Sequence, residues 1–466
     1  MKNTSTAASR ECRVVSATGS LGVTPFHEGS FQAALQRNPH AIGADAGSGD
    51  IGPSFLGGDI SYPPAEWEKR DLELLVQAAL DLDVPLIVGS AGGAGTNSAV
   101  DRYAAFVREA VQRSGHRGIA VARIYAEVPL AYLEQRARAG EVMPLGFPGP
   151  LSQEAVRASS RVVAMMGVEP LLEAMRRGAQ IIVAGRATDD AVFAAVPMLQ
   201  GFDKATALHM GKLIECASIV ATPPLMRETV MGTVRENGQN EIIISAIHPD
   251  QRCTPASVAG HSMYERPDPT ELLLPGGRLD LSHVTFETHD RQSTKVTGAT
   301  FVPADFYAVK LEGAGWVGER AFTLFAFRDP ISIAHIDEIL TFITDEAARV
   351  LPGVERDRDY RLVFHIYGRD GVMGALEPVK HIASHEVAVV AEIVGPTREF
   401  VERLGALVKY ASLRAYYKGK LGTAGGAAFL QDEIWFSPRG AFHWTVDHLL
   451  PLSDPLELFP ISLEEV

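Results

Sequence analysis

The sequence predicts an α/β protein with a parallel, doubly wound sheet in its N-terminal half, followed by a β-rich segment and a smaller α+β domain. Three observations lead to this prediction. Up to about residue 220, short apolar runs alternate with amphipathic segments of about 10–15 residues, which is the pattern of βαβ units. After Thr222 the chain becomes rich in Pro, Gly, Thr and Val, and from Ile331 helical periodicity returns. We therefore expect domains at 1–222, 223–330 and 331–466.

The strands of the first half are predicted from short apolar runs that are too short to form helices. They are expected at Arg13–Ala17, Ala41–Ala46, Pro85–Gly89, Ile119–Tyr125, Val162–Met166 and Ile181–Ala184. Helices are expected at Gly29–Gln36, Trp67–Leu82, Ser98–Ser114, Leu130–Ala139, Pro170–Gly178, Asp190–Gln200 and Asp203–Ser218. In the last part we expect a helix from Ile331 to Val350, strands at Arg361–Tyr367 and Glu386–Val394, a helix at Thr397–Leu413, and a final strand at Ala441–Leu449.

Composition and net charge exclude several classes of protein and of binding partner. The chain has 466 residues, of which 46% are hydrophobic and 21% charged, as in a soluble globular protein with two or three cores. A net charge of −14 argues against nucleic acid and anionic membranes as partners. No apolar run approaches the roughly 18 residues of a membrane span, and the first residues do not resemble a signal peptide. A cytoplasmic location and a homo-oligomer are the expectation. Cys12, Cys216 and Cys253 form neither a disulfide framework nor a zinc motif.

Polar residues gather directly after the predicted strand Ile181–Ala184. Following Gly185, they are Arg186, Thr188, Asp189 and Asp190. Ligands of open α/β sheets bind at the carboxyl ends of strands, Arg offers a fork of donors to a carboxylate or phosphate, and Asp can act as a base or metal ligand. A binding site is therefore predicted here. The alternative is structural: Thr188 or Asp189 caps the next helix and Arg186 pairs with Asp190.

Two glycine-rich loops follow other predicted strands. Loop 89–97 runs into a helix, so its amides could hold a phosphate or carboxylate, although a tight turn packed on the sheet is equally consistent with it. Its candidate substrate-binding residues are Ser90, Gly92, Gly93, Thr96 and Asn97. Loop 43–52 carries Asp45 and Asp50, which could bind a divalent metal ion, act as acid and base, or simply hold the turn. Loop 89–97 lacks the Gly-x-Gly-x-x-Gly spacing of dinucleotide-binding loops, and neither loop has the Gly-Lys-Ser/Thr ending of a P-loop.

The predicted helix Asp203–Ser218 carries a second group of candidates. His209, Lys212 and Cys216 fall within about 60° of one another, and Glu215 lies about 60° further round. A thiol near a histidine suggests a nucleophile, but a lone cysteine on an apolar face usually serves core packing, and Lys212 is expected in solvent. Glu215 has apolar neighbours that would raise its pKa if it is buried, which makes it the better acid or base.

Several segments resemble the acyclic terpene utilisation family, the AtuA-like proteins. They are Met166–Met175, Gly178–Asp190, His209–Cys216, Gly318–Phe322, Phe327–Ile331 and Ile336-Asp337. The most specific elements are Gly-Arg-x-x-Asp and Ile-Glu-Cys, and the resemblance extends over about residues 40–450. It implies functional positions at Gly185, Arg186, Asp189, Glu215 and Cys216. Segment 43–60 resembles a single branch, so the chain is placed in a divergent sub-branch.

The resemblance implies carboxylic acid catabolism, in which branched acids or their acyl-CoA thioesters are degraded. A lyase or hydratase fits the residues, with Arg186 and loop 89–97 binding anionic groups and Asp189 or Glu215 moving the proton. A divalent metal ion on Asp45 and Asp50 could stabilise the enolate. One alternative is an acyl or CoA transferase that forms a covalent intermediate on Glu215 or Cys216. Another is a non-catalytic subunit that needs a small companion protein, as relatives of this branch imply.

Overall fold

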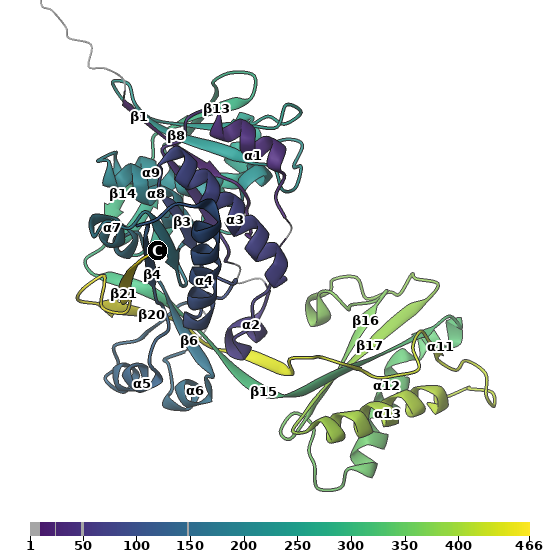
Figure 1. Ribbon diagram of the computed structural model, residues 1–466. Coiled ribbons are helices and arrows are strands. Elements are labelled where there is room, and N and C mark those ends of the chain that lie inside the picture. The colour runs from purple at the N-terminus through teal and green to yellow at the C-terminus, as the bar shows by residue number, and fades with distance from the viewer. Residues whose placement is uncertain (1–9, 24, 48–50, 147–148) are drawn as a thin grey trace, which may run out of the picture. The chain divides into compact units, whose positions relative to one another are not determined.

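The computed structural model describes residues 10–23, 25–47, 51–146 and 149–466, which form two compact units (Figure 1). The first unit contains the chain up to Ala314 together with Trp444–Val466, and the second contains Gly315–His443. Within the described residues, no helix is both long enough and apolar enough to cross a membrane.

A ten-stranded mixed sheet forms the centre of the first unit. Its parallel part contains, in spatial order, β1 (Arg10–Ser16), β2 (Ala41–Asp45), β3 (Leu86–Gly89), β7 (Ile181–Ala184) and β4 (Ala120–Ile124). All residues of β2, β3 and β7 are buried, as expected of strands covered on both faces. The α/β class is confirmed, and these five strands supply the parallel pairing.

Helices cover both faces of this sheet, because alternate strand residues pack into two different cores. The core on one face includes residues of α1 (Glu28–Leu35), α3 (Ala65–Leu82) and α4 (Asn97–Ser114). The core on the other face includes residues of α7 (Glu169–Arg176), α8 (Asp189–Leu199) and α9 (Lys204–Ile214). The other α-helices of this unit among the described residues are α2 (Pro53–Gly58), α5 (Leu130–Arg138), α6 (Gln153–Ala158) and α10 (Pro255–Ser262).

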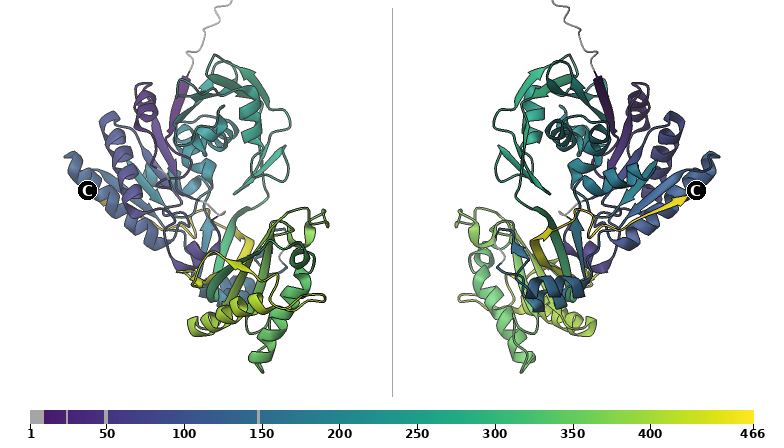
Figure 2. Two further views of the ribbon diagram at one scale, coloured as in Figure 1. Left: turned by 90° about the vertical axis from the view of Figure 1, so that its right-hand side faces the viewer. Right: turned by 90° about the vertical axis from the view of Figure 1, so that its left-hand side faces the viewer.

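The segment 223–330 is β-rich, but it is not a separate part of the molecule. Its strands β8 (Val230–Glu236), β9 (Asn240–Ala246), β13 (Ser293–Thr297) and β12 (Thr285–Thr288) continue the central sheet beyond β1 in antiparallel pairing. This pairing satisfies the backbone groups that β1 would otherwise leave free at the sheet edge. At the opposite edge, β21 (Ile461–Glu465) pairs antiparallel with β4; the C-terminus that follows it is marked in Figure 2.

The predicted strand Val162–Met166 does form, but not in the central sheet. As β6 (Arg161–Met165) it pairs antiparallel with the beginning of the long strand β15 (Tyr307–Phe327). A fully apolar run indicates burial and does not reveal which strand will be its partner. The pairing places Lys310 opposite Met165 and Glu312 opposite Val163, and so brings both β15 side chains to the carboxyl ends of the parallel strands.

The second unit has the predicted α+β composition. The later part of β15 pairs with β17 (Val387–Gly395), which pairs in turn with β16 (Arg361–Tyr367), all antiparallel. α12 (Ile336–Val350) and α13 (Arg398–Arg414) share a core with these strands. The expected limits 331–466 differ from those of the unit, because β20 (Ala441–Leu452) leads the chain back to the first unit.

The remaining elements are short. They are β5 (Met143–Pro144), η1 (Ala217–Val220), β10 (Glu271–Leu274), β11 (Gly277–Asp280), β14 (Thr300–Pro303), α11 (Pro330–Ala334), η2 (Gly374–Leu376), β18 (Ala428–Phe429) and β19 (Trp435–Phe436).

Candidate functional site

The turn after β7 has the form that the sequence predicts. Gly185 ends the strand, and a Cβ atom at this position would lie 2.7 Å from the Cβ of Ala126, so the turn needs glycine. Thr188 is the N-cap residue of α8 and Asp189 is the first residue of that helix. The turn therefore directs Arg186 and Asp189 toward the carboxyl ends of the strands, where a polar pocket of about 350 Å³ opens.

This pocket brings together most of the acidic and basic residues predicted for the site. Asp45, Arg186, Asp189, Glu215 and Cys216 all line it. The lining also contains residues that the sequence pattern did not indicate, among them Tyr264, Glu265, Lys310 and Glu312. Five predicted residues that are up to 171 positions apart in the chain thus face one cavity.

Arg186 forms a buried ion pair at one end of the pocket. Its Nε donates to Glu312 at 2.9 Å, and Lys310 Nζ donates to the same carboxylate at 3.0 Å. Burial opposes ionisation of Glu312, but Arg186 and Lys310 outweigh it and lower the pKa of Glu312 to about 2. Burial also disfavours the charged form of Arg186, yet the carboxylates of Glu312 and Asp189 raise its pKa. The structural alternative of a pair with Asp190 is wrong, because the partner is Glu312.

Carboxylates gather at the other end. Oxygen atoms of Asp189, Glu215 and Glu265 all lie within 4.8 Å of one another. Lys212 Nζ donates a hydrogen bond to Glu215 and lies 3.7 Å from Glu265. Lys212 is only 6% exposed, so the expectation that it lies in solvent is wrong. Burial raises the pKa of Glu215, and the charge of Asp189 raises it further, as the apolar neighbours in the sequence predicted.

Cys216 lies beside these carboxylates but does not have the environment of a reactive thiol. Burial raises the pKa of its thiol, and the carboxylate of Glu215 adds to this effect. A nucleophilic cysteine needs the opposite surroundings, with cationic groups or a helix N-terminus that lower the thiol pKa. The backbone of Cys216 is closely packed, since a Cβ atom on Gly19 would lie 2.7 Å from its carbonyl oxygen.

Loop 89–97 has structural contacts that bear on its predicted role. Ser90 Oγ accepts a hydrogen bond from the Ala187 N–H, and Thr96 caps α4 by accepting from the Ala99 N–H. The Asn97 N–H, at the start of the helix, already donates to the carboxylate of Glu127 at 2.8 Å. None of the five loop residues predicted to bind substrate lines the polar pocket. An anion-binding role for Ser90, Gly92, Gly93, Thr96 and Asn97 stays a prediction.

Of the two aspartates in loop 43–52 that were predicted to bind a metal ion, the structure describes one. Asp45 is buried at the end of β2, where one carboxylate oxygen accepts from the Gly47 N–H at 3.1 Å. Burial raises the pKa of Asp45, and the charge of Asp189 adds to the effect. Asp50 lies outside the described residues. A metal site that combines Asp45 and Asp50 therefore stays a prediction.

The comparison with known families agrees with the resemblance seen in the sequence. The model of the acyclic terpene utilisation family protein AtuA matches residues 60–434, which is most of the chain. The chain belongs to this family. The match includes Arg186, Asp189, Glu215, Cys216 and Glu312, while Asp45 precedes it. No curated protein and no solved structure matches the chain.

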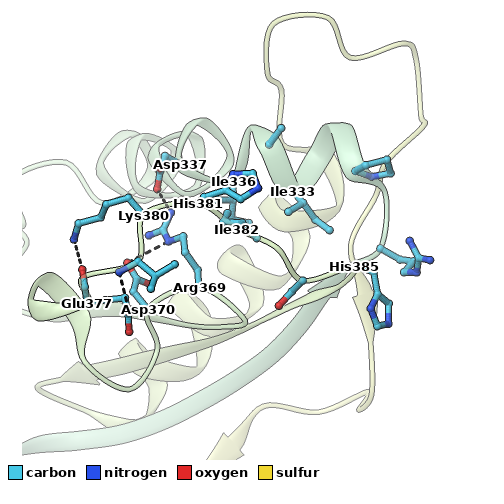
Figure 3. A pocket seen from close by; sticks show the side chains of 15 residues that line it. Ile333, Ile336, Asp337, Arg369, Asp370, Glu377, Lys380, His381, Ile382 and His385 are labelled. Carbon is cyan, nitrogen blue, oxygen red and sulfur yellow. Dashed lines mark hydrogen bonds and ion pairs between the residues drawn. The ribbon is translucent and has the colours of Figure 1, made fainter.

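This AtuA-family chain also has a larger cavity in its second unit, of about 710 Å³ (Figure 3). Several of its polar side chains contact neighbours: Arg369 lies between Asp337 and Asp370, and Lys380 donates to the Glu377 carbonyl. His381 and His385 line it from a loop. The smaller pocket of the first unit is the better of these two candidates, because buried, unlike charges meet in it at strand ends.

Asp190, next to the candidate base, makes the stability of this AtuA-family protein depend on pH. Burial raises the pKa of Asp190 to about 7, and the charge of Asp189 contributes. Since the folded state holds this proton more tightly than the unfolded chain, stability falls as the pH rises from about 4 to about 7. Asp190→Asn should remove this loss, which amounts to about 4 kcal/mol over that range. Urea unfolding of both proteins at several pH values measures the difference; parallel curves would contradict the buried-acid interpretation.

Proposed function

We propose that this chain is a catabolic lyase or hydratase that acts in acyclic terpene utilisation. Its substrate would be a small branched carboxylic acid or the acyl part of its CoA thioester, from which a proton next to the carbonyl is removed. The observation that carries this proposal is the division of the pocket into a cationic and an acidic end. A volume of about 350 Å³ is sufficient for a small acid or an acyl group.

The cationic end would bind the substrate oxygen atoms. Arg186 and Lys310 both pair with Glu312, and Lys310 Nζ also lies 3.5 Å from Asp447, whose side chain is 49% exposed. A substrate carboxylate would replace Asp447 as the partner of the positively charged Lys310. Lys310 is more accessible than Arg186, with a side chain that is 35% exposed. Its positive charge attracts a carboxylate and stabilises the negative charge that develops on a carbonyl oxygen during enolate formation.

The acidic end would supply the base. Asp189 lines the pocket and is less buried than Glu215, which makes it the carboxylate that a substrate can reach. Glu215 is fixed by Lys212 on one side and lies beside Asp189 on the other, so we assign it the positioning of the base. In a dehydration, Asp189 takes the proton from carbon and then returns it to the hydroxyl group on the neighbouring carbon. The C–O bond breaks as the C=C bond forms, water leaves, and the carboxylate of Asp189 is regenerated.

Two other functions use the same pocket differently. A transferase would form a covalent intermediate on Glu215 or Cys216, and the raised pKa of the Cys216 thiol counts against the thiol version. A non-catalytic subunit would bind the acid but would need a small companion protein for turnover. Turnover by the isolated chain would exclude the second alternative, and trapping a mass adduct on the peptide containing Glu215 would favour the first.

A thermal-shift panel tests the binding half of the proposal. Branched free acids, hydroxy acids and their CoA thioesters are compared on the wild type, on Lys310→Ala and on the surface control Lys295→Ala. At about 100 times its Kd, a ligand adds roughly 2.7 kcal/mol of stability. We expect one of these acid classes to raise the Tm of the wild type and of Lys295→Ala, and to lose most of this effect with Lys310→Ala. No shift with any acid or thioester would contradict the proposed substrate class.

A further inference from the structure

Beside the polar pocket, two helix ends bring together three side chains of different chemistry. Glu215 is the C-cap residue of α9, Cys216 follows it, and His261 lies in the last turn of α10. A carboxylate oxygen, the Sγ atom and an imidazole nitrogen of these residues all lie within 4.8 Å of one another. Small side-chain movements would bring all three atoms to the 2.0–2.3 Å bonds of a common metal ion. We propose that Glu215, Cys216 and His261 bind one divalent metal ion of the zinc class.

Two of the three proposed ligand residues have a buried side-chain atom without a hydrogen-bond partner among the described residues. These atoms are Oε2 of Glu215 and Nε2 of His261, whose residues are only 2% and 5% exposed. Leaving such an atom unsatisfied costs about 1–3 kcal/mol, more for a charged group, so two of them in one place indicate a missing partner. An ion that both atoms can reach would satisfy them together.

The donor set selects the kind of ion. Carboxylate oxygen, sulfur and imidazole nitrogen are the three ligand types of protein zinc sites, whereas Mg²⁺ and Ca²⁺ require oxygen ligands. Three protein ligands leave the fourth tetrahedral position open, as in catalytic zinc sites. Glu215 and Cys216 also line the polar pocket, so that position would face the place where a substrate binds.

The charges around the three ligands also favour a cation. Asp189, Glu215 and Glu265 form a second group of close carboxylates here, and Lys212 supplies the ammonium group that pairs with Glu215 and Glu265. When the three carboxylates are ionised, one ammonium group leaves an excess of two negative charges, which a divalent ion would neutralise. Lys212 contacts Oε1 of Glu215, so Oε2 remains for the metal.

Binding of the ion is inferred independently of the proposed reaction. If that reaction is also right, an ion at the open position would polarise the substrate carbonyl or the leaving hydroxyl group. This site differs from the predicted pair Asp45 and Asp50, which lies on the other side of Arg186 in the chain and contributes none of the three ligands.

Cobalt titration of the full chain tests the site without any substrate. After chelator treatment and dialysis, Co²⁺ is added and the near-ultraviolet absorption of a cobalt–thiolate bond is recorded; Zn²⁺ is then added as competitor. We expect one Co²⁺ per chain, the thiolate band, and loss of the band on addition of Zn²⁺. Cys216→Ser should abolish the band, and His261→Asn should weaken binding at least about tenfold. Cys253→Ala is the matched control and should behave as the wild type.

Circular dichroism of each protein shows whether a variant has lost its fold. The cobalt titration of the wild type tests the metal site even if a variant fails to fold. Folded wild type that gives no cobalt–thiolate band, or that binds Co²⁺ equally with and without the Cys216 thiol, would overturn the site. Because no substrate is present, this failure is distinct from a failure of the lyase or hydratase proposal.

Discussion

Asp189→Asn should lower kcat by about 10²- to 10⁴-fold on whichever acid or thioester the binding panel selects, since this is the usual contribution of a general base. Asparagine keeps the size of the side chain but cannot accept the proton. Because Arg186 and Lys310 still bind the substrate oxygen atoms, KM should change much less than kcat. Steady-state kinetics of the variant and the wild type give both values.

The matched control for this experiment is Asp250→Asn, an aspartate in an exposed turn that does not line the pocket. It should leave kcat and KM unchanged. A variant Asp189→Asn with normal kcat would remove Asp189 from the role of base. A variant with a raised KM and an unchanged kcat would assign Asp189 to binding instead.

Glu312→Ala should reduce the free energy of unfolding by about 3–5 kcal/mol, the typical loss when one partner of a buried ion pair is removed. Arg186 is 7% exposed, and Glu312 provides its close carboxylate contact, at 2.9 Å. Without Glu312, the guanidinium group would stay in a buried setting with its nearest counter-charge gone, and Lys310 would add a second cation. Urea unfolding of the first unit, followed by a probe within it, measures the loss.

Glu173→Ala provides the comparison, because Glu173 pairs with Arg177 on the surface of α7 in the same unit. Removing this exposed pair should cost no more than about 1 kcal/mol. If Glu312→Ala were as mild as Glu173→Ala, Arg186 would have to find other compensation, and its buried pair could not be what fixes the cationic end of the pocket.

The local sequence pattern was sufficient to predict the parallel strands and part of the candidate site. The parallel strands, the glycine turn at Gly185 and the polar residues after it lie where the sequence places them, because burial and turn chemistry act over a few neighbouring residues. The apolar neighbours of Glu215 likewise indicated its burial correctly.

Such local patterns could not predict which distant segments of the chain pair with one another. Glu312 reaches Arg186 across 126 positions, from a strand whose alternation gives no sign of its partner. For the same reason, β6 was placed in the wrong sheet, and the antiparallel continuation of the central sheet by β8 and β9 was missed. Lys212 was misplaced because a helical lysine usually extends to solvent, whereas here Glu215 at the end of its own helix and Glu265 from another segment compensate its charge.

In the proposed reaction, Asp189 removes a proton from the carbon next to a carbonyl group. The most direct measurement of this step is deuterium incorporation: the acid or thioester that binds is incubated in D₂O with wild type or Asp189→Asn, and the recovered material is analysed by mass spectrometry. We expect the wild type to incorporate deuterium at that carbon, and the variant to do so at least about 100-fold more slowly. A ligand that binds in the pocket but acquires deuterium equally fast with both proteins, or with neither, would contradict this role of Asp189.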